Sequence, residues 1–451
     1  MKRNNYYDVT DWQVGNPYTD IGEVINSIIA DIKNRQKDTN VNDGGKPGAV
    51  IYIPSGDYHL KTQVKIDISY LKIQGSGHGF VSSSIRYNVP KEQWKDLHDI
   101  WPGGSRILVD LEPLKGDERS GAAFLVEREG DPRISSVEFE NFCIDGLHFV
   151  DDGNGDPENT YLNGKTGIYV ASAQDSFRIT GMGIIYLEHG VTLYNSALSV
   201  HDNFIAECGN CVELRGAGQA SKITDNLMGA GYRGYTIFAE NFGGLLITSN
   251  NIFPRGKSIV HLKGVLRSSV TANRFHSFYP GMLIMENCRE NLISSNHFLR
   301  DHEPWPPMLE YDNGLEDDFG LIHIQGSSNS LIANHISETI EQQYLKPAGV
   351  KPIIIRLVSG RENYIANNHI VATTKIDKKE SEENQSCFDA QVGALLSMDE
   401  LVKLPIEAVH VDEASLDNII LDTCRENEAV MDFAENVFRG IPCLSQSAEL
   451  S

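Results

Sequence analysis

Two carboxylates in one short stretch have the residue types and the spacing for glycosidic-bond chemistry. Asp202 and Glu213 lie eleven residues apart within residues 198–214. Glu213 stands between Val212 and Leu214, so strand alternation points its side chain away from the core that takes these apolar neighbours. Carboxylates that flank a glycosidic bond protonate the leaving oxygen and activate the attacking hydroxyl. The pair is a candidate acid and base for glycosyl transfer, although two solvated surface groups are the common alternative in a chain with 62 acidic residues.

The elements that position this pair are rungs of a repeat. An apolar residue, an Asn three positions later and usually a second apolar residue two further on recur in Val200/Asn203/Ile205, Ile223/Asn226/Met228, Ile247/Asn250/Ile252, Val270/Asn273/Phe275, Ile293/Asn296/Phe298, Leu331/Asn334/Ile336 and Tyr364/Asn367/His369. A period in the low twenties with short β-rich runs is typical of a parallel β-helix, an all-β solenoid whose rungs stack like strands in a sheet. Asn tolerates left-handed backbone geometry and its amide can bond its copy one rung away, so the Asn column is interpreted as structural.

The repeat also relates the acidic residues to one another. Asp202 precedes one Asn of the column and Asp225 precedes the next, so their carboxylates would stack about 4.8 Å apart. Asp225 is therefore a candidate substrate-binding residue. The offset of Glu213 places it on the next strand of the same rung, and we expect Asp202 and Glu213 to face one groove at a bend.

Composition and charge exclude several classes of partner. Lys and Arg number 39 against 62 Asp and Glu, which gives a formal charge of −23. This charge repels phosphate backbones and anionic lipids, so neither nucleic acid nor a membrane is an expected partner. The chain has no apolar run of about 18 residues, the length of a membrane span. Its N-terminus lacks the apolar core of a signal peptide, which predicts a cytoplasmic protein.

The chain divides into three expected parts. Residues 1–48 hold a helix that starts at Asp20 and caps the solenoid; residues 49–372 form the β-helix; residues 373–451 form a linker and a C-terminal cap or lid, with a closing helix at 426–438. The capping helix is predicted from an apolar stripe at helical spacing, Ile21, Val24, Ile25, Ile28, Ile29 and Ile32.

Irregular stretches and cysteines carry no predicted chemistry. Residues 87–118 and 147–165 read as loops on the solenoid wall, and the acidic run 151–156 lacks the flanks and terminal Glu of an EF-hand. Cys208 and Cys211 have metal-ligand spacing but no second pair, so a turn of small buried residues is the interpretation. The seven cysteines are an odd number scattered over the chain and are expected as reduced thiols. No metal or cofactor is predicted.

Five segments carry a resemblance to a known family. "YDVTDW", "DIGEVINSIIADIK", "PGAVIYIPSGDYHL", "LKIQGSGHGF" and "SVHDNFIAECGNCVEL" resemble inulin fructotransferases, glycoside hydrolase family 91, and the likeness runs over residues 6–372. The resemblance implies a right-handed, single-stranded, pectin-lyase-like parallel β-helix and a homotrimer with active sites near subunit contacts. Family enzymes release a difructose dianhydride (DFA) from inulin by intramolecular transfer, or hydrolyse DFA-III to inulobiose.

The family's essential carboxylates are an Asp and a Glu eleven residues apart, which only Asp202 and Glu213 match. By that resemblance Glu213 is the acid/base at the glycosidic oxygen, and Asp202 orients or deprotonates the sugar hydroxyl, although the roles can be exchanged. Family transferases carry secretion leaders and the hydrolases act inside cells, so the DFA-III hydrolase is the preferred interpretation. The alternatives are an inulin fructotransferase, a non-catalytic trimeric carbohydrate-binding β-helix or tailspike, and a pectate-type lyase, for which no calcium site or basic set is clear.

Overall fold

The structure is a computed structural model of the 451-residue chain. It describes residues 5–37, 47–80, 89–98, 101–130, 132–146, 162–171, 175–194, 197–230, 234–254, 257, 259–302, 313–341, 351–375, 401–403, 406–421, 431–432 and 438–439. The predicted linker after Lys375, the acidic run 151–156 and Trp305 lie outside these residues. None of the helices in the described ranges has the length and hydropathy that a membrane span requires.

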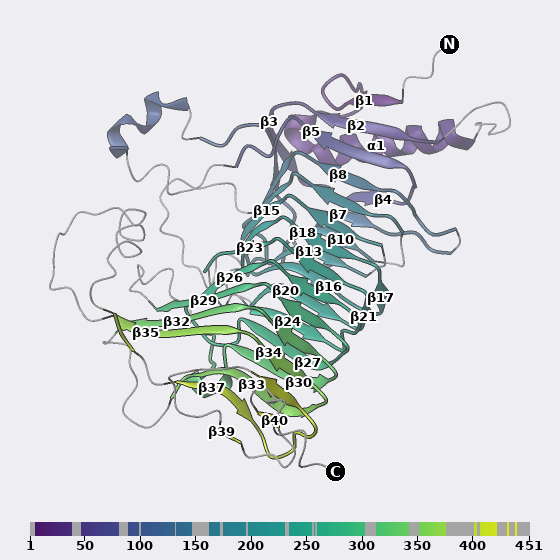
Figure 1. Cartoon of the computed structure of the whole chain (residues 1–451). Coiled ribbons are helices and arrows are strands. Elements are labelled where there is room, and N and C mark those ends of the chain that lie inside the picture. The colour runs from purple at the N-terminus through teal and green to yellow at the C-terminus, as the bar shows by residue number, and fades with distance from the viewer. Residues whose placement is uncertain are drawn as a thin grey trace.

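The described chain winds into a single solenoid of three long sheets, and this confirms the predicted right-handed parallel β-helix (Figure 1). Their strands pair in parallel, except that β36 (Leu401–Lys403) at the end of one sheet pairs in antiparallel with its neighbour. Each rung contributes one strand to each sheet in turn, as β14 (Ser199–His201), β15 (Phe204–Cys208) and β16 (Asn210–Leu214) do. Apolar side chains from all three sheets fill the interior in one continuous core. The solenoid therefore presents three long outer faces, on which polar side chains alternate with the core residues.

The three sheets are defined by the order of their strands along the solenoid. The first sheet contains β1 (Tyr6–Asp8), β2 (Ala49–Ile53), β5 (Leu71–Gly75), β8 (Glu138–Glu140), β11 (Arg178–Thr180), β14, β18 (Lys222–Thr224), β22 (Leu246–Thr248), β25 (Ser269–Thr271), β28 (Leu292–Ser294), β31 (Ser330–Ile332), β34 (Tyr364–Ala366), β38 (Ile419–Leu421) and β40 (Phe438–Arg439). The second sheet contains β3 (Gly56–Leu60), β6 (Ser105–Val109), β9 (Cys143–Asp145), β12 (Gly183–Ile185), β15, β19 (Leu227–Ala230), β23 (Asn251–Ile252), β26 (Arg274–Ser277), β29 (His297–His302), β32 (His335–Glu341), β35 (His369–Lys375) and β36 (Leu401–Lys403). The third sheet contains β4 (Val64–Ile66), β7 (Ala122–Val126), β10 (Thr166–Val170), β13 (His189–Leu193), β16, β20 (Tyr235–Glu240), β24 (Ile259–Lys263), β27 (Leu283–Arg289), β30 (Ile322–Ser327), β33 (Ile353–Arg361), β37 (Glu407–Val411) and β39 (Met431–Asp432).

The helix α1 (Pro17–Lys37) covers the N-terminal end of the solenoid, as predicted (Figure 1). Its whole predicted apolar stripe is buried. Asp20 has an extended backbone and its Oδ1 accepts the amide of Gly22 at 3.0 Å, which is the geometry of a helix cap. Its Oδ2 also accepts the hydroxyl of Thr62 at 2.6 Å, so the cap residue ties the helix to the first rung.

The predicted Asn column forms a ladder at the turn between the first and second sheets. The Nδ2 of each Asn donates to the Oδ1 of the next at 2.9 to 3.0 Å from Asn203 to Asn334 and on to Asn368. The last rung was therefore predicted one residue too early, because Asn334 pairs with Asn368 and not with Asn367. The expected left-handed backbone belongs to the preceding residue, as at Asp202, whose φ is +55°.

A second ladder, which the sequence pattern did not reveal, lies between the third and first sheets. Asn291, Asn329, Asn363 and Asn418 bond in the same way at 2.9 to 3.1 Å. Two ladders satisfy the buried polar groups at two of the three corners and hold successive rungs in register.

A predicted loop, a predicted domain boundary and a predicted helix differ from the structure. Within the predicted loop 87–118, β6 is a rung strand that pairs with β3 and β9. Past residue 372, β37 and β38 pair in parallel with β33 and β34, so the described strands extend the solenoid beyond the predicted boundary. The helix predicted at 426–438 is wrong where the structure describes it, because β39 and β40 add strands there.

Candidate active site

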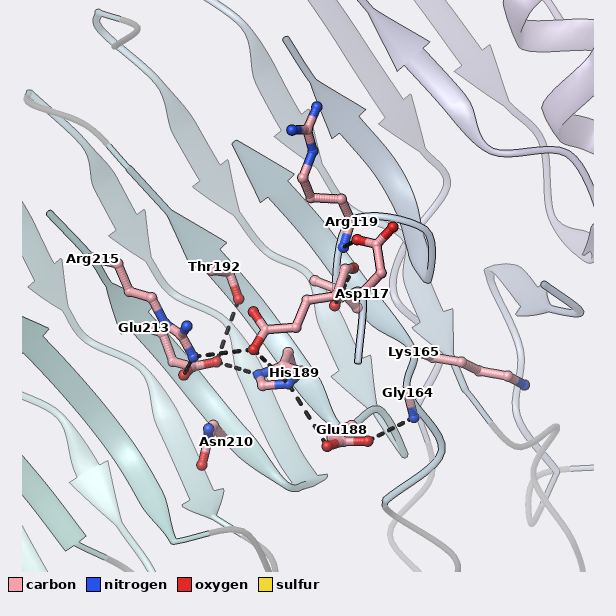
Figure 2. A network of polar contacts seen from close by, with 12 residues as sticks. Asp117, Arg119, Gly164, Lys165, Glu188, His189, Thr192, Asn210, Glu213 and Arg215 are labelled. Atoms are coloured by element: carbon pink, nitrogen blue, oxygen red, sulfur yellow. Dashed lines mark hydrogen bonds and ion pairs between the residues drawn. The ribbon is translucent and has the colours of Figure 1, made fainter. Parts of the chain in front are cut away.

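Glu213 is the centre of a buried polar network on the outer face of the third sheet. Its neighbours Val212 and Leu214 enter the core, as alternation predicted, and Glu213 itself is only 1% exposed. Its Oε2 lies 2.5 Å from His189 Nδ1 and its Oε1 lies 2.5 Å from an Nη of Arg215. Figure 2 shows the carboxylate held between these two side chains. His189 is the first residue of β13, and Arg215 directly follows the end of β16 at Leu214.

These contacts determine the charge of Glu213. Burial raises its pKa, but the bonds and charges of His189 and Arg215 lower it by more, and the pKa falls below its ordinary value. The same contact raises the pKa of Arg215, although burial opposes the rise. Glu213 is therefore an ionised carboxylate at neutral pH, although it is almost completely buried.

Two further carboxylates surround His189 on the other side. Glu118, from the loop between β6 and β7, lies 3.5 Å from both His189 Nε2 and Arg215. Glu188 lies 3.9 Å from His189 Nε2 and accepts the amide of Gly164 at 2.7 Å (Figure 2). The site thus combines three acids with one guanidinium and one imidazole.

Aromatic side chains adjoin this network along the same sheet. Phe238 pairs with Glu213 one rung further on, and its ring lies 5.2 Å from that of Tyr235 and 5.6 Å from that of His261. All three are half-buried. Aromatic rings beside ionisable groups suit a sugar, which offers C–H faces and hydroxyl edges.

Asp202 lies elsewhere on the rung. It occupies the exposed turn between β14 and β15, at the corner of the first and second sheets, whereas Glu213 points outward from the third sheet. A rung has three sides, so this corner lies across the core from Glu213. Within one chain the two carboxylates therefore do not share a groove, in contrast to the expectation from their spacing.

The segment after β5 and the strand β15 supply the surroundings of Asp202. His78 is half-buried near it, and burial lowers the pKa of this histidine although the charge of Asp202 opposes the shift. The rings of Phe80 and Phe204 stack at 4.4 Å on the same face. Asp202 thus borders a second surface that also combines a carboxylate, an imidazole and aromatic rings.

Asp225 follows Asp202 along the ladder but makes a different contact. Its Oδ2 lies 3.3 Å from Nδ1 of His201, on the neighbouring rung. Its carboxylate is about half exposed, at 52%. A sugar-binding role for Asp225 stays a prediction.

The Cys208 and Cys211 pair forms a buried turn. Both thiols lie near backbone carbonyl oxygens, and burial raises the pKa of Cys208 to about 12. Within the described ranges, no group of three or more His, Cys, Asp or Glu side chains is arranged to hold a metal ion.

Comparison with known proteins places the chain. The β-helix repeat model of inulin fructotransferase matches residues 295–442, and a model of the periplasmic copper-binding protein NosD matches residues 136–304. The DFA-I-forming inulin fructotransferase of Arthrobacter globiformis is 42% identical over 377 residues, 82% of this chain and 90% of that relative. The chain belongs to the inulin fructotransferase family.

Solved structures within this family resemble the chain over nearly its whole length. The DFA-IIIase of Arthrobacter chlorophenolicus A6 in complex with DFA-III is 61% identical, covers 98% of this chain and 99% of its own, and superposes with a TM-score of 0.88. The same enzyme in complex with GF2 has a TM-score of 0.87. The chain is therefore a fructan-active enzyme of the inulin fructotransferase family.

Sequence reasoning identified Glu213 but missed its partners. His189 lies 24 residues earlier, about one rung before it. Arg215 stands two residues after Glu213, just past the end of β16, and this spacing was the available signal for a neighbouring cation on the same face. The residue one rung before Glu213 is Thr192, whereas His189 pairs with Asn210, so the repeat by itself did not connect His189 with Glu213.

Proposed function

We propose that this enzyme hydrolyses DFA-III to inulobiose. The ionised Glu213, buried between His189 and Arg215 beside half-buried aromatic rings, is the observation that carries the proposal. The 61% identity to a DFA-IIIase, against 42% to a DFA-I-forming transferase, supports the hydrolase over the transferase.

We further propose that the active site forms between subunits of a homotrimer. Glu213 and Asp202 lie on different faces of one solenoid, so one chain does not bring both to one sugar. A neighbouring copy can place its Asp202 corner against the third sheet of the first copy. Each of the three equivalent contacts in a cyclic trimer then contains one Glu213 and one Asp202.

The roles follow from the chemistry of the bond. Glu213 acts at the glycosidic oxygen, which needs a proton as its bond to the anomeric carbon breaks. Asp202 of the neighbouring copy takes a proton from the water that adds to this carbon. Arg215 keeps the Glu213 carboxylate in one orientation through a charge-assisted hydrogen bond.

The second candidate function is intramolecular transfer on inulin, which the identity to the DFA-I-forming enzyme favours. It uses the same two carboxylates, but a hydroxyl of the substrate replaces water as the attacking group. The two functions therefore differ in substrate and product, not in the acid and base.

Product analysis tests both functions. The purified protein is incubated separately with DFA-III and with inulin, and the products are read by chromatography. Inulobiose from DFA-III supports the hydrolase, and a dianhydride from inulin without further hydrolysis supports the transferase. No product from either substrate contradicts both.

The same assay is run on Asp202→Asn and Glu213→Gln. We expect each to lose at least about 100-fold in rate, since acid–base groups typically contribute that much. Glu290→Gln is the matched control, because Glu290 pairs with Arg267 at a turn and has no contact with the network. A rate near that of the unmodified protein in either site variant would contradict the proposed roles.

A further inference from the structure

Three histidines form a column on the outer face of the second sheet. His297, His335 and His369 each directly follow an Asn of the ladder between the first and second sheets, and they pair in register on β29, β32 and β35. Phe298 and Ile336, the next residues on the first two of these strands, are buried in the core, so alternation directs the histidines outward. The bonds of the ladder hold the three rungs in register, and this fixes the spacing of the column.

The last two rings of the column are in contact through like atoms. Nδ1 of His335 lies 3.0 Å from Nδ1 of His369, and the ring centroids are 4.9 Å apart. Two neutral imidazoles at this distance share one hydrogen, which one Nδ1 donates to the lone pair of the other. A metal ion that takes the place of this hydrogen is bound by both nitrogens.

The distance between the two nitrogens fits a metal ion. Bonds of about 2.05 Å, the length between an imidazole nitrogen and zinc, put two ligand atoms about 2.9 Å apart at a right angle and about 3.3 Å apart at the tetrahedral angle. The observed 3.0 Å lies within this range and close to the right angle of a tetragonal site, which Cu²⁺ and Ni²⁺ prefer. Neither backbone has to move for the two rings to bind one ion.

A neighbouring hydroxyl group supports the tautomer that a metal requires. Nε2 of His335 lies 3.0 Å from Oγ of Ser337, two residues further along β32. When Nε2 carries the hydrogen and donates it to this oxygen, Nδ1 keeps its lone pair and directs it toward His369. Histidine ligands usually donate their second N–H group in this way, and the bond holds the ring in its orientation.

The surroundings of the pair favour a bound cation. His335 and His369 are both exposed, so water can fill the remaining coordination positions. Partial burial and the neighbouring His369 lower the pKa of His335, so its ring is neutral at neutral pH, which is the form that binds metal. The formal charge of −23 on the chain also attracts cations to its surface.

We infer that His335 and His369 form a chelating site for a divalent transition-metal ion, with Nδ1 of each ring as a ligand. Binding moves the shared hydrogen to Nε2 through exchange with solvent, so both rings stay neutral and nothing is oxidised or reduced. Cu²⁺ should bind most tightly, followed by Ni²⁺ and Zn²⁺. Four strands of the second sheet separate β32 from β15, which follows Asp202, so the inference does not depend on the proposed function.

The test is calorimetric titration with Ni²⁺ of the full-length protein without an affinity tag, after treatment with a chelator. The chain contains 14 histidines, so the site is assigned by comparison with variants. His335→Asn and His369→Asn each remove one ligand from an exposed position. His297→Asn is the matched control, because it removes a histidine of the same column whose ring meets that of His335 edge-on, with the centroids 5.0 Å apart.

We expect the unmodified protein and His297→Asn to bind one ion per chain with the same affinity. His335→Asn and His369→Asn should bind at least about 10-fold more weakly, since the loss of even a hydrogen-bond partner of a ligand costs that much. Equal affinities in all four proteins would overturn the inference, because the binding would then be adventitious. An equal loss in His297→Asn would overturn the assignment to this pair.

Electron paramagnetic resonance with Cu²⁺ counts the ligands directly. One equivalent of Cu²⁺ should show coupling to two nitrogen atoms in the unmodified protein and to one in His369→Asn. Ser337→Ala should keep both couplings and bind about 10-fold more weakly, because both ligands remain and only the bond that orients His335 is lost. The same nitrogen count in the unmodified protein and in His369→Asn would contradict the site.

Discussion

Mixed assemblies of two inactive variants test the placement of Asp202 and Glu213 on different faces. The Asp202→Asn chain keeps Glu213, and the Glu213→Gln chain keeps Asp202. If each site takes one residue from each of two neighbouring chains, a contact between the two variants in one order contains both native carboxylates. The mixture should therefore recover activity that neither variant has alone.

The size of the recovery follows from the symmetry. The two chains carry different affinity tags, are co-expressed, and are purified on both tags, so every trimer contains both variants. Two copies of one variant and one of the other give three contacts around the ring, of which one has the productive order. The expected rate is therefore about one third of the unmodified rate per trimer, for either composition.

The alternative arrangement gives a different result. If one chain supplied both residues to its own site, every site in the mixture would lack one carboxylate, and the mixture would be as inactive as its parents. Co-expression of the unmodified chain with the double variant is the control, because shared sites then give about one sixth of the full rate and unshared sites about one half. No recovery in the first mixture would refute the shared site.

Three further changes have expected outcomes. Burial raises the pKa of Glu338 to about 7, so the folded state loses stability as pH rises from about 4.5 to about 7. Glu338→Gln should remove this loss of about 3 kcal/mol, and its melting temperature at pH 8 should therefore be higher than that of the unmodified protein. Asn250→Ala leaves buried ladder partners unsatisfied and should cost about 3 kcal/mol in chemical denaturation, whereas the exposed Asn251→Ala should cost less than about 0.5. Arg215→Met removes a group that lowers the pKa of Glu213, so the pH above which kcat falls should move higher, as a pH profile of kcat would show.

Each of these predictions has a contradicting result. Equal melting temperatures of Glu338→Gln and the unmodified protein at pH 8, with parallel curves at lower pH, would show that ionisation of Glu338 costs nothing. Similar denaturation midpoints for the two Asn variants would mean that the ladder contributes little. A shift to lower pH in Arg215→Met would reverse the electrostatic argument for Glu213.

The fold could be predicted because its signals are local. The spacing of the Asn residues records the length of a rung, and the stripe on α1 records a buried helix face. The same spacing did not distinguish Asn367 from Asn368, since both are asparagines at adjacent positions. The pairing with Asn334 decides between them, and that pairing is a contact between rungs which no single rung contains.

The site could be predicted only in part. Alternation around Glu213 gave its outward direction, but it would have turned His189 inward with Val191, two residues further on. The corner breaks alternation at Gly190, where a side chain would come within 2.6 Å of the carbonyl oxygen of Cys211. Asp202 lies in a turn and not on a strand, so an offset of eleven residues did not reveal which side of the rung it occupies.

The position of both carboxylates on one rung has a consequence for how this enzyme can change in length. Residues on one rung lie at the same height along the solenoid, and rotation about an axis parallel to the solenoid keeps that height. Gain or loss of a whole rung outside residues 199–214 moves Asp202 and Glu213 equally, by about 4.8 Å, and leaves neighbouring copies aligned. An insertion between them separates the pair in every copy, so we expect length variation among relatives to fall outside this rung.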